Sequence, residues 1–141
     1  MKALFIATYH RDEWRHHAHI LSWLRSAGYE ITVADITDIP KAPTAELVAG
    51  IDTVLLYHTG FALERGKAPV VTDLAAVYGH IAEECAASGI PLYGIFMQSH
   101  SPEARHRNTP IEWREWNKET MEFFVRMAET DIPFDTRPPP H

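Results

Sequence analysis

The chain has 141 residues, a formal net charge of −6 and a single cysteine. The acidic balance argues against a nucleic-acid interface, which needs clustered Lys and Arg. One cysteine excludes an intramolecular disulfide and a cysteine-rich zinc site, and it fits a reducing cytoplasm. No apolar run approaches the roughly 20 residues of a membrane span, and the N-terminus leads into a strand without a signal peptide. We therefore expect a cytoplasmic protein with no membrane or nucleic-acid partner.

Strands and helices alternate along the chain, as the periodicity of its apolar residues indicates. The predicted elements are a strand at 2–8, a helix at 12–27, a strand at 30–35, a short helix at 44–49, a strand at 53–57, a helix at 72–87, a strand at 91–97 and a helix at 111–129. These elements form one α/β domain at 1–130, and the proline-rich residues 131–141 are expected to be a disordered tail.

This order predicts the fold class. Right-handed crossovers between parallel strands give a doubly wound α/β sheet of four parallel strands, in the order 2-1-3-4. The architecture expected is a flavodoxin-like three-layer sandwich. Its topological switch point lies between the first and third strands, where ligands bind outside the carboxyl ends of the strands.

Three of the four predicted strands lead into a histidine at that carboxyl edge, namely His10, His58 and His100. Histidine has an unperturbed pKa close to neutrality and therefore serves as an acid, a base or a metal ligand. We expect these histidines to be acid–base groups of a hydrolytic or transfer enzyme acting on a small polar molecule. The residues expected to bind that ligand are Tyr9, Arg11, Thr59, Gly60 and Arg105.

The turn after the first strand does not suit a phosphate. No glycine precedes Gly28, and Asp12 and Glu13 occupy the first helical turn, where they repel an anion. A Rossmann-type nucleotide site and an ordinary flavodoxin phosphate loop are both disfavoured, and no cofactor is expected.

A metal site is the alternative interpretation. His10-Arg-Asp-Glu13 is similar to the His-Pro-Asp-Asp motif of the LmbE-like zinc N-deacetylases. That resemblance implies that His10 and Glu13 are metal ligands and that Asp12 is the base. With His58 and His100 as further ligands, the site would hold a divalent metal such as zinc in a hydrolase. The nearby His16, His17 and His19 spread around a helix and are expected to be solvated.

A second resemblance concerns residues 1–97 as a layout. Gly79 and Glu83 have the glycine-to-glutamate spacing of the nucleoside 2-deoxyribosyltransferase-like superfamily, and Gly89 and Pro91 match its entry to the next strand. The resemblance implies that Glu83 is the nucleophile or acid at a glycosidic bond and that Tyr9 contacts the ligand. A nucleoside or nucleotide is then the first candidate substrate. The interpretation from residues alone makes Glu83 a solvated helix residue.

The last predicted helix is rich in apolar residues, only about half of which one stripe can bury against the sheet. Those residues are Ile111, Trp113, Trp116, Met121, Phe123, Phe124, Val125 and Met127. The surplus predicts a homodimer formed through this helix. It also leaves open a third interpretation, a non-catalytic module that binds a ligand or a partner.

Overall fold

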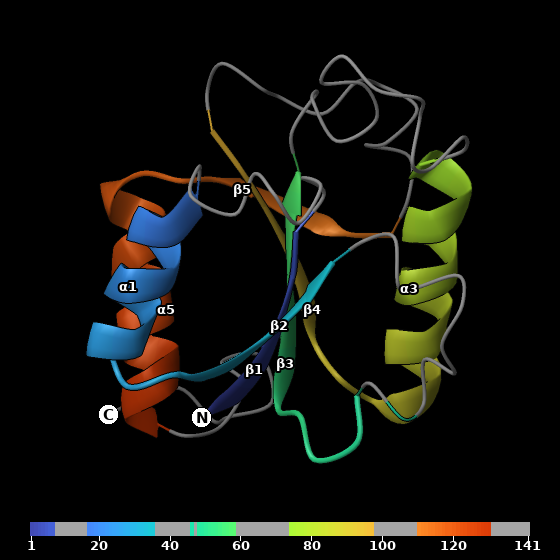
Figure 1. Cartoon of the computed structure of the whole chain (residues 1–141), viewed down its shortest axis with the longest axis horizontal. Coiled ribbons are helices and arrows are strands. Elements are labelled where there is room, and N and C mark those ends of the chain that lie inside the picture. The colour runs from blue at the N-terminus through green and yellow to red at the C-terminus, as the bar shows by residue number, and fades with distance from the viewer. Residues whose placement is uncertain (8–16, 36–45, 47, 59–73, 98–109, 131–141) are drawn as a thin grey trace, which may run out of the picture.

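The computed structural model describes residues 1–7, 17–35, 46, 48–58, 74–97 and 110–130, and these form a sheet flanked by helices (Figure 1). In chain order the elements are β1 (Lys2–Ala7), α1 (Ala18–Ser26), β2 (Glu30–Asp35), β3 (Thr53–His58), α3 (Leu74–Ser88), β4 (Leu92–Phe96), β5 (Glu112–Glu115) and α5 (Lys118–Thr130). No helix among these residues is long and apolar enough to cross a membrane. The expected tail at 131–141 lies outside the described residues.

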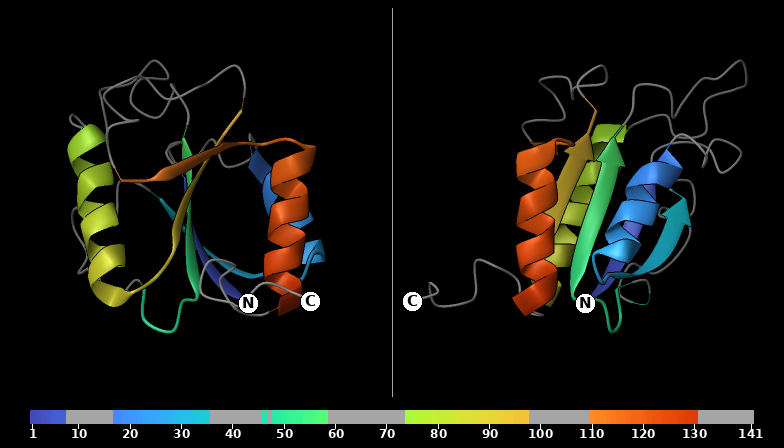
Figure 2. Two further views of the ribbon diagram at one scale, coloured as in Figure 1. Left: turned by 180° about the vertical axis from the view of Figure 1, so that it is seen from behind. Right: turned by 90° about the vertical axis from the view of Figure 1, so that its left-hand side faces the viewer.

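All strand pairs are parallel, and the strands lie in the order β2-β1-β3-β4-β5. Helices α1 and α5 cover one face of the sheet and α3 covers the other, so the molecule has three layers (Figures 1 and 2). The predicted doubly wound, flavodoxin-like fold and the order of its first four strands are confirmed. The observed sheet has one further strand, β5, at its edge.

The extra strand takes up the first part of the last predicted helix. Apolar and polar residues alternate from Ile111 to Arg114, which is the period of a strand rather than of a helix. The helix begins only after Asn117, whose side-chain oxygen accepts a hydrogen bond from the Thr120 N–H at 3.0 Å. The prediction of one helix over 111–129 was therefore wrong for the residues of β5.

The core consists of two apolar layers, one on each face of the sheet. Strand β3 is buried along its whole length because it lies in the middle of the sheet and is covered on both sides. Between the sheet and α1 and α5 lie, among others, Phe5, Ile20, Leu24, Leu55, Tyr57, Phe124 and Met127. Between the sheet and α3 lie, among others, Leu4, Ile6, Val54, Leu56, Tyr78, Ile81 and Cys85.

Two glycines end the helices that cross over the sheet. Gly28 follows α1 with φ +109°, and Gly89 follows α3 with φ +68°. In both cases the next residue donates its N–H back to the last turn, Tyr29 to the Leu24 carbonyl at 3.1 Å and Ile90 to the Cys85 carbonyl at 2.9 Å. The chain thus turns directly from each helix toward the following strand.

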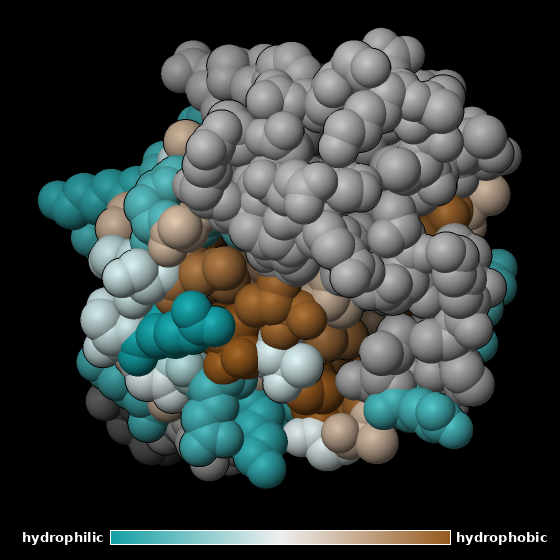
Figure 3. All heavy atoms as spheres, in the orientation of Figure 1, coloured by the Kyte–Doolittle hydropathy of each residue, from teal (hydrophilic) through white to brown (hydrophobic). Residues whose placement is uncertain are grey.

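The front of the molecule in Figure 1 shows the β2 side of the sheet. Hydrophobic side chains gather there over β2 and beside α1 (Figure 3). Ile31 and Val33 of β2 are half-buried and pack against the core layer under α1 and α5. The outer edge of β2 pairs with no other strand among the described residues.

Candidate functional site

His58 is the last residue of β3 and lies at the carboxyl edge of the sheet, next to β1 on one side and β4 on the other. Because side chains alternate along a strand, His58 shares the α3 face with Val54 and Leu56. It is only 4% exposed. Its Nδ1 lies 2.6 Å from the Tyr78 hydroxyl oxygen, at hydrogen-bond distance. The end of β3 and the first turns of α3 therefore bring together one buried polar pair, His58 and Tyr78.

Trp113 covers this pair from β5. Its ring is 5.6 Å from the ring of His58 and 5.6 Å from the ring of Tyr78, measured between centroids. The approach depends on Gly94, which lies opposite Trp113 in the β4–β5 register. A Cβ at Gly94 would lie 2.2 Å from Trp113 Cε3, so only glycine leaves room for the indole. His58, Tyr78 and Trp113 are called the aromatic site below.

The hydrogen bond to Tyr78 determines what the other ring nitrogen of His58 can do. When the Tyr78 hydroxyl donates to Nδ1, a neutral His58 carries its proton on Nε2 and acts as a donor there. When Nδ1 carries the proton and donates to Tyr78, Nε2 is an acceptor and hence a base. A proton taken up at Nε2 of this second form gives the imidazolium, and acid–base catalysis requires exchange between that cation and a neutral form of the ring.

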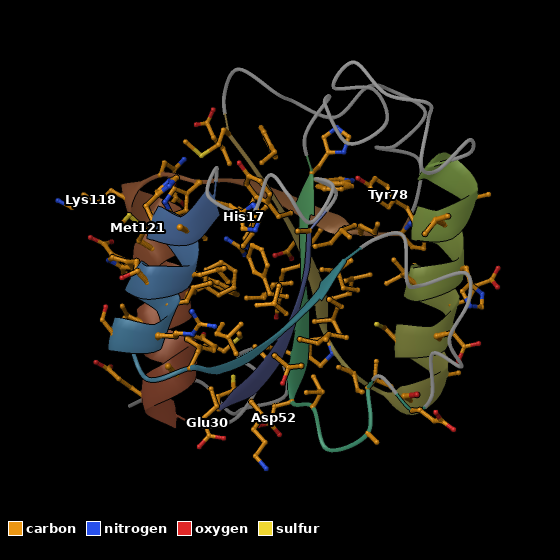
Figure 4. All side chains as sticks on the ribbon, viewed as in Figure 1. His17, Glu30, Asp52, Tyr78, Lys118 and Met121 are labelled. Carbon is orange, nitrogen blue, oxygen red and sulfur yellow. The ribbon has the colours of Figure 1, made fainter. Side chains whose placement is uncertain are left out.

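A second buried histidine lies on the opposite face of the sheet. His17 immediately precedes α1 and is 0% exposed. Its ring packs against Phe5 at 5.4 Å and against Tyr57 at 5.1 Å between centroids. His17 and Tyr78 both lie at the upper end of the sheet in Figure 4, on opposite sides of the strands. The prediction that His17 is solvated was therefore wrong, whereas His19 is exposed as expected.

The reason for the burial of His17 is its position at the entry to α1. There it precedes the first buried residue of the helix, Ile20, by three positions, which is the spacing of one helix face. An imidazole also packs well against aromatic rings, and Phe5 and Tyr57 supply two of them on the neighbouring strands β1 and β3, both tilted relative to the His17 ring.

Most of the predicted site lies outside the described residues. These positions are Tyr9, His10, Arg11, Asp12, Glu13, Thr59, Gly60, His100 and Arg105. Their convergence on His58 stays a prediction, as does the metal alternative that uses His10, Glu13 and His100. Among the residues that the structure describes, no three His, Cys, Asp or Glu side chains are grouped in a way that would hold a metal ion.

Glu83 is described, and it lies apart from the aromatic site. It is exposed on the outer face of α3, whereas the inner face of that helix packs on the sheet through Tyr78, Ile81 and Cys85. Gly79 lies inside α3 rather than at its start. The glycine-to-glutamate spacing noted in the sequence thus falls within a continuous helix, and the role of Glu83 stays a prediction.

Tyr78 and Trp113 are site residues that the sequence pattern does not single out. Tyr78 fits the apolar stripe of its helix, and Trp113 falls in the segment predicted as the last helix. For Trp113 the sequence does carry a partial signal, because the alternation of apolar and polar residues around it is typical of a strand. The partnership with His58 depends on strand order and helix placement, which pattern alone does not give.

No family model matches the chain, and no curated protein matches it. Solved structures with a similar arrangement include a 3-dehydroquinate dehydratase-like protein from Bifidobacterium longum, with 13% identity and a TM-score of 0.47 over 90% of this chain and 97% of that one. A flavodoxin from the domain Archaea has 11% identity and a TM-score of 0.43, over 92% of this chain and 98% of that one. Neither is a nucleoside transferase, and at this level of similarity neither bears on function.

Proposed function

We propose that the protein is a small cytoplasmic enzyme that binds a small polar molecule at the carboxyl edge of its sheet, next to the switch point between β1 and β3. His58 acts there as an acid–base group, oriented by Tyr78. The reaction is a hydrolysis or a group transfer, and a nucleoside or nucleotide is the first substrate class to test. The acting unit is a homodimer formed through α5.

The observation that carries the proposal is the 2.6 Å contact between His58 Nδ1 and the Tyr78 hydroxyl oxygen. A histidine whose Nδ1 is fixed by a hydrogen bond has a defined ring orientation, and its Nε2 then faces one direction. His58 also stands at the end of a central strand, where open α/β sheets bind their ligands. Position and orientation together favour a chemical role over a purely structural one.

The aromatic site also supports a catalytic environment. Tyr78 is fully buried and Trp113 is half-buried, so both keep water away from His58 on the α3 side. A proton transfer in such surroundings benefits from stronger electrostatic interactions than it has in water. His10, which follows β1 in the sequence, is the proposed partner of His58 in the acid–base pair.

The experiment is a thermal-shift screen of nucleosides, nucleotides and other small polar compounds, followed by product analysis for every compound that raises the melting temperature. Turnover of a hit is then compared in the wild type, His58→Gln, Tyr78→Phe and His10→Ala. Loss of an acid–base group lowers turnover by about 10²- to 10⁴-fold. Unchanged binding and turnover in a variant that lacks both His10 and His58 would show that the site is wrongly assigned.

Elemental analysis of protein purified without chelator belongs to the same experiment. About one equivalent of zinc, together with a melting temperature lowered by EDTA, would favour the metallohydrolase alternative with His10, Glu13, His58 and His100 as ligands. An unchanged melting curve in EDTA is the result expected for metal-independent acid–base chemistry.

A further inference from the structure

Helix α5 has a mixed apolar and charged stripe on the side that faces away from the sheet. Between this stripe and α1 lies a hollow of about 490 Å³, lined by Trp23, Lys118, Met121, Glu122, Val125 and Arg126. In Figure 4 Lys118 and Met121 point outward from the α1–α5 layer, away from the strands. The stripe is therefore a surface feature and not part of the core.

Most of the apolar residues that predicted a dimer are used inside the molecule. Phe123, Phe124 and Met127 are buried in the core layer under α1 and α5, and Trp116 packs against that layer. What remains on the outer side is a short apolar strip formed by Met121, Val125 and Trp23 of α1, all half-buried. A strip of this size suits a small and reversible contact better than an obligate one.

The charged residues beside the strip are ordered so that two copies of α5, placed antiparallel, bring opposite charges together. Along α5 they run positive at Lys118, negative at Glu122, positive at Arg126 and negative at Glu129, and all four side chains are exposed. Reversing the helix about the point between Phe123 and Phe124 brings position 118 opposite position 129. The same reversal brings Glu122 within one residue of the reversed Arg126, so each of these four charges lies opposite or next to an opposite charge.

The apolar residues obey the same symmetry. Under that reversal Met121 comes within one residue of the reversed Val125, so the apolar strip meets itself between the two charged pairs. A two-fold interface requires just this, because the same patch must be complementary to its own copy. The hollow beside Trp23 gives the incoming side chains a place to insert.

From this self-complementary order we propose that α5 packs antiparallel against α5 of a second copy of the chain, with Lys118 of one protomer facing Glu129 of the other. The inference rests on the homodimer proposed above and specifies its geometry. It does not depend on the chemistry at His58. The two-fold axis passes between Phe123 and Phe124, and each dimer contains the Lys118–Glu129 contact twice.

Charge reversal in trans tests this geometry directly. Lys118→Glu and Glu129→Lys each place like charges at both contacts of a homodimer and should weaken it about tenfold at low salt, since exposed pairs contribute roughly 0.2–1 kcal/mol each. A mixture of the two variants restores both contacts at once. At one contact the two substituted side chains, acidic at position 118 and basic at position 129, meet each other, and at the other contact the native Lys118 and Glu129 meet. The mixed dimer should therefore form in preference to either homodimer, and the preference should fall as salt is raised.

The readouts are sedimentation over a range of protein concentrations and native mass spectrometry of the mixture with one variant labelled. Glu46→Lys is the matched control, because it changes an exposed acid outside α1 and α5 and should leave the dimer unchanged. The trans design also separates this contact from pairing within a helix. Lys118 and Glu122 are one turn apart and can interact in the same chain, but such pairs do not produce a preference for the mixed dimer.

The outcomes distinguish the two proposals. A wild type that stays monomeric at every concentration overturns both the homodimer and its geometry, and leaves the chemistry at His58 to be judged by turnover. A wild-type dimer that neither variant weakens, with no preference in the mixture, overturns the α5 geometry alone. Weakened homodimers together with a preferred mixed dimer establish it.

Discussion

The indole of Trp113 lies so close to Gly94 that a methyl group on the glycine would stand 2.2 Å from Trp113 Cε3. This close approach joins β5 to β4 and holds Trp113 over His58 and Tyr78. The smallest residue of a core strand thus sets the position of one wall of the aromatic site.

Gly94→Ala tests that relationship. The added methyl group forces Trp113 to move, and overpacking of this kind costs about 1–3 kcal/mol of unfolding free energy. Gly79→Ala is the matched control, since a Cβ there meets nothing within 4 Å and Gly79 lies inside α3. Alanine is favoured over glycine in a helix by about 1 kcal/mol, so this variant should be slightly more stable. Urea unfolding measures the free energy of unfolding of both variants. Equal changes in that free energy for the two substitutions would contradict the close packing of Trp113.

Tyr78→Phe tests whether the Tyr78 hydroxyl contributes to ligand binding or turnover in addition to the stability of the fold. It removes the hydroxyl that bonds His58 Nδ1, at a cost of about 1–2 kcal/mol, and it should also weaken ligand binding or turnover. Tyr29→Phe is its control, because the Tyr29 hydroxyl donates to the Phe124 carbonyl at 2.6 Å in the other core layer. That variant should lose similar stability in urea unfolding and keep the activity. Equal activity losses in the two variants would mean that Tyr78 acts only through stability.

The thiol of Cys85 should be inert in the folded protein. Burial, with a smaller contribution from the charge of Glu84, raises the pKa of Cys85 from 9.0 to about 11. At pH 8 a thiol reagent such as DTNB should react with the unfolded chain rapidly and with the native protein only as fast as the protein opens. Rapid labelling of native protein would contradict the packing of Cys85 between α3 and the sheet.

The same shift predicts a loss of stability at alkaline pH. Below pH 9 the thiol is protonated in both states, and its contribution to stability is fully present. Between pH 9 and about pH 11 the unfolded chain releases the proton while Cys85 in the native protein retains it. The free energy of unfolding should therefore fall by about 2–3 kcal/mol across this window. Burial raises the pKa of Tyr29 as well, in the same direction. Urea unfolding at several pH values should show a smaller slope for Cys85→Ala, and an equal slope would exclude the thiol as a cause.

Arg114 should stabilise β5 mainly through an aromatic contact. Its guanidinium carbon lies 3.7 Å from the centroid of the Phe123 ring, and its Nε bonds the Glu112 carboxylate at 2.6 Å. Arg114→Ala should cost about 1 kcal/mol, largely independent of salt, because a cation–π contact and packing are lost. Glu112→Ala should cost less, and that cost should vanish at high salt because Glu112 is more than half exposed. Equal, salt-sensitive losses in urea unfolding would assign the stability to the ion pair.

The sequence predicted the layers and the order of the first four strands because these follow from periodicity and from the handedness of crossovers. Continuous apolar runs such as the one ending at Tyr57 identify central strands, and glycines such as Gly28 mark helix ends. The edge strand was missed because four residues of alternation before Asn117 are a weak signal beside a strongly apolar helix. β5 has four residues, none of them buried, so it lacks the continuous apolar run that identifies a central strand.

The candidate site was predicted less completely than the fold. His58 could be placed at a strand end from its position after an apolar run. The burial of His17 and the partnership of Tyr78 with His58 depend on which rings meet across the sheet, and that is a tertiary property. A histidine in a run such as Arg15-His-His-Ala-His19 looks solvated by pattern, yet one of them packs against both Phe5 and Tyr57.

The most direct test of the proposed chemistry is a long-range ¹H–¹⁵N NMR spectrum of the histidine side chains, recorded across neutral pH with and without a ligand from the screen. We predict that the ligand shifts the Nε2 resonance of His58, while Nδ1 keeps its bond to Tyr78. The spectrum of Tyr78→Phe assigns that bond. A saturating, turned-over ligand that leaves both nitrogens of His58 unchanged would contradict an acid–base role for this residue.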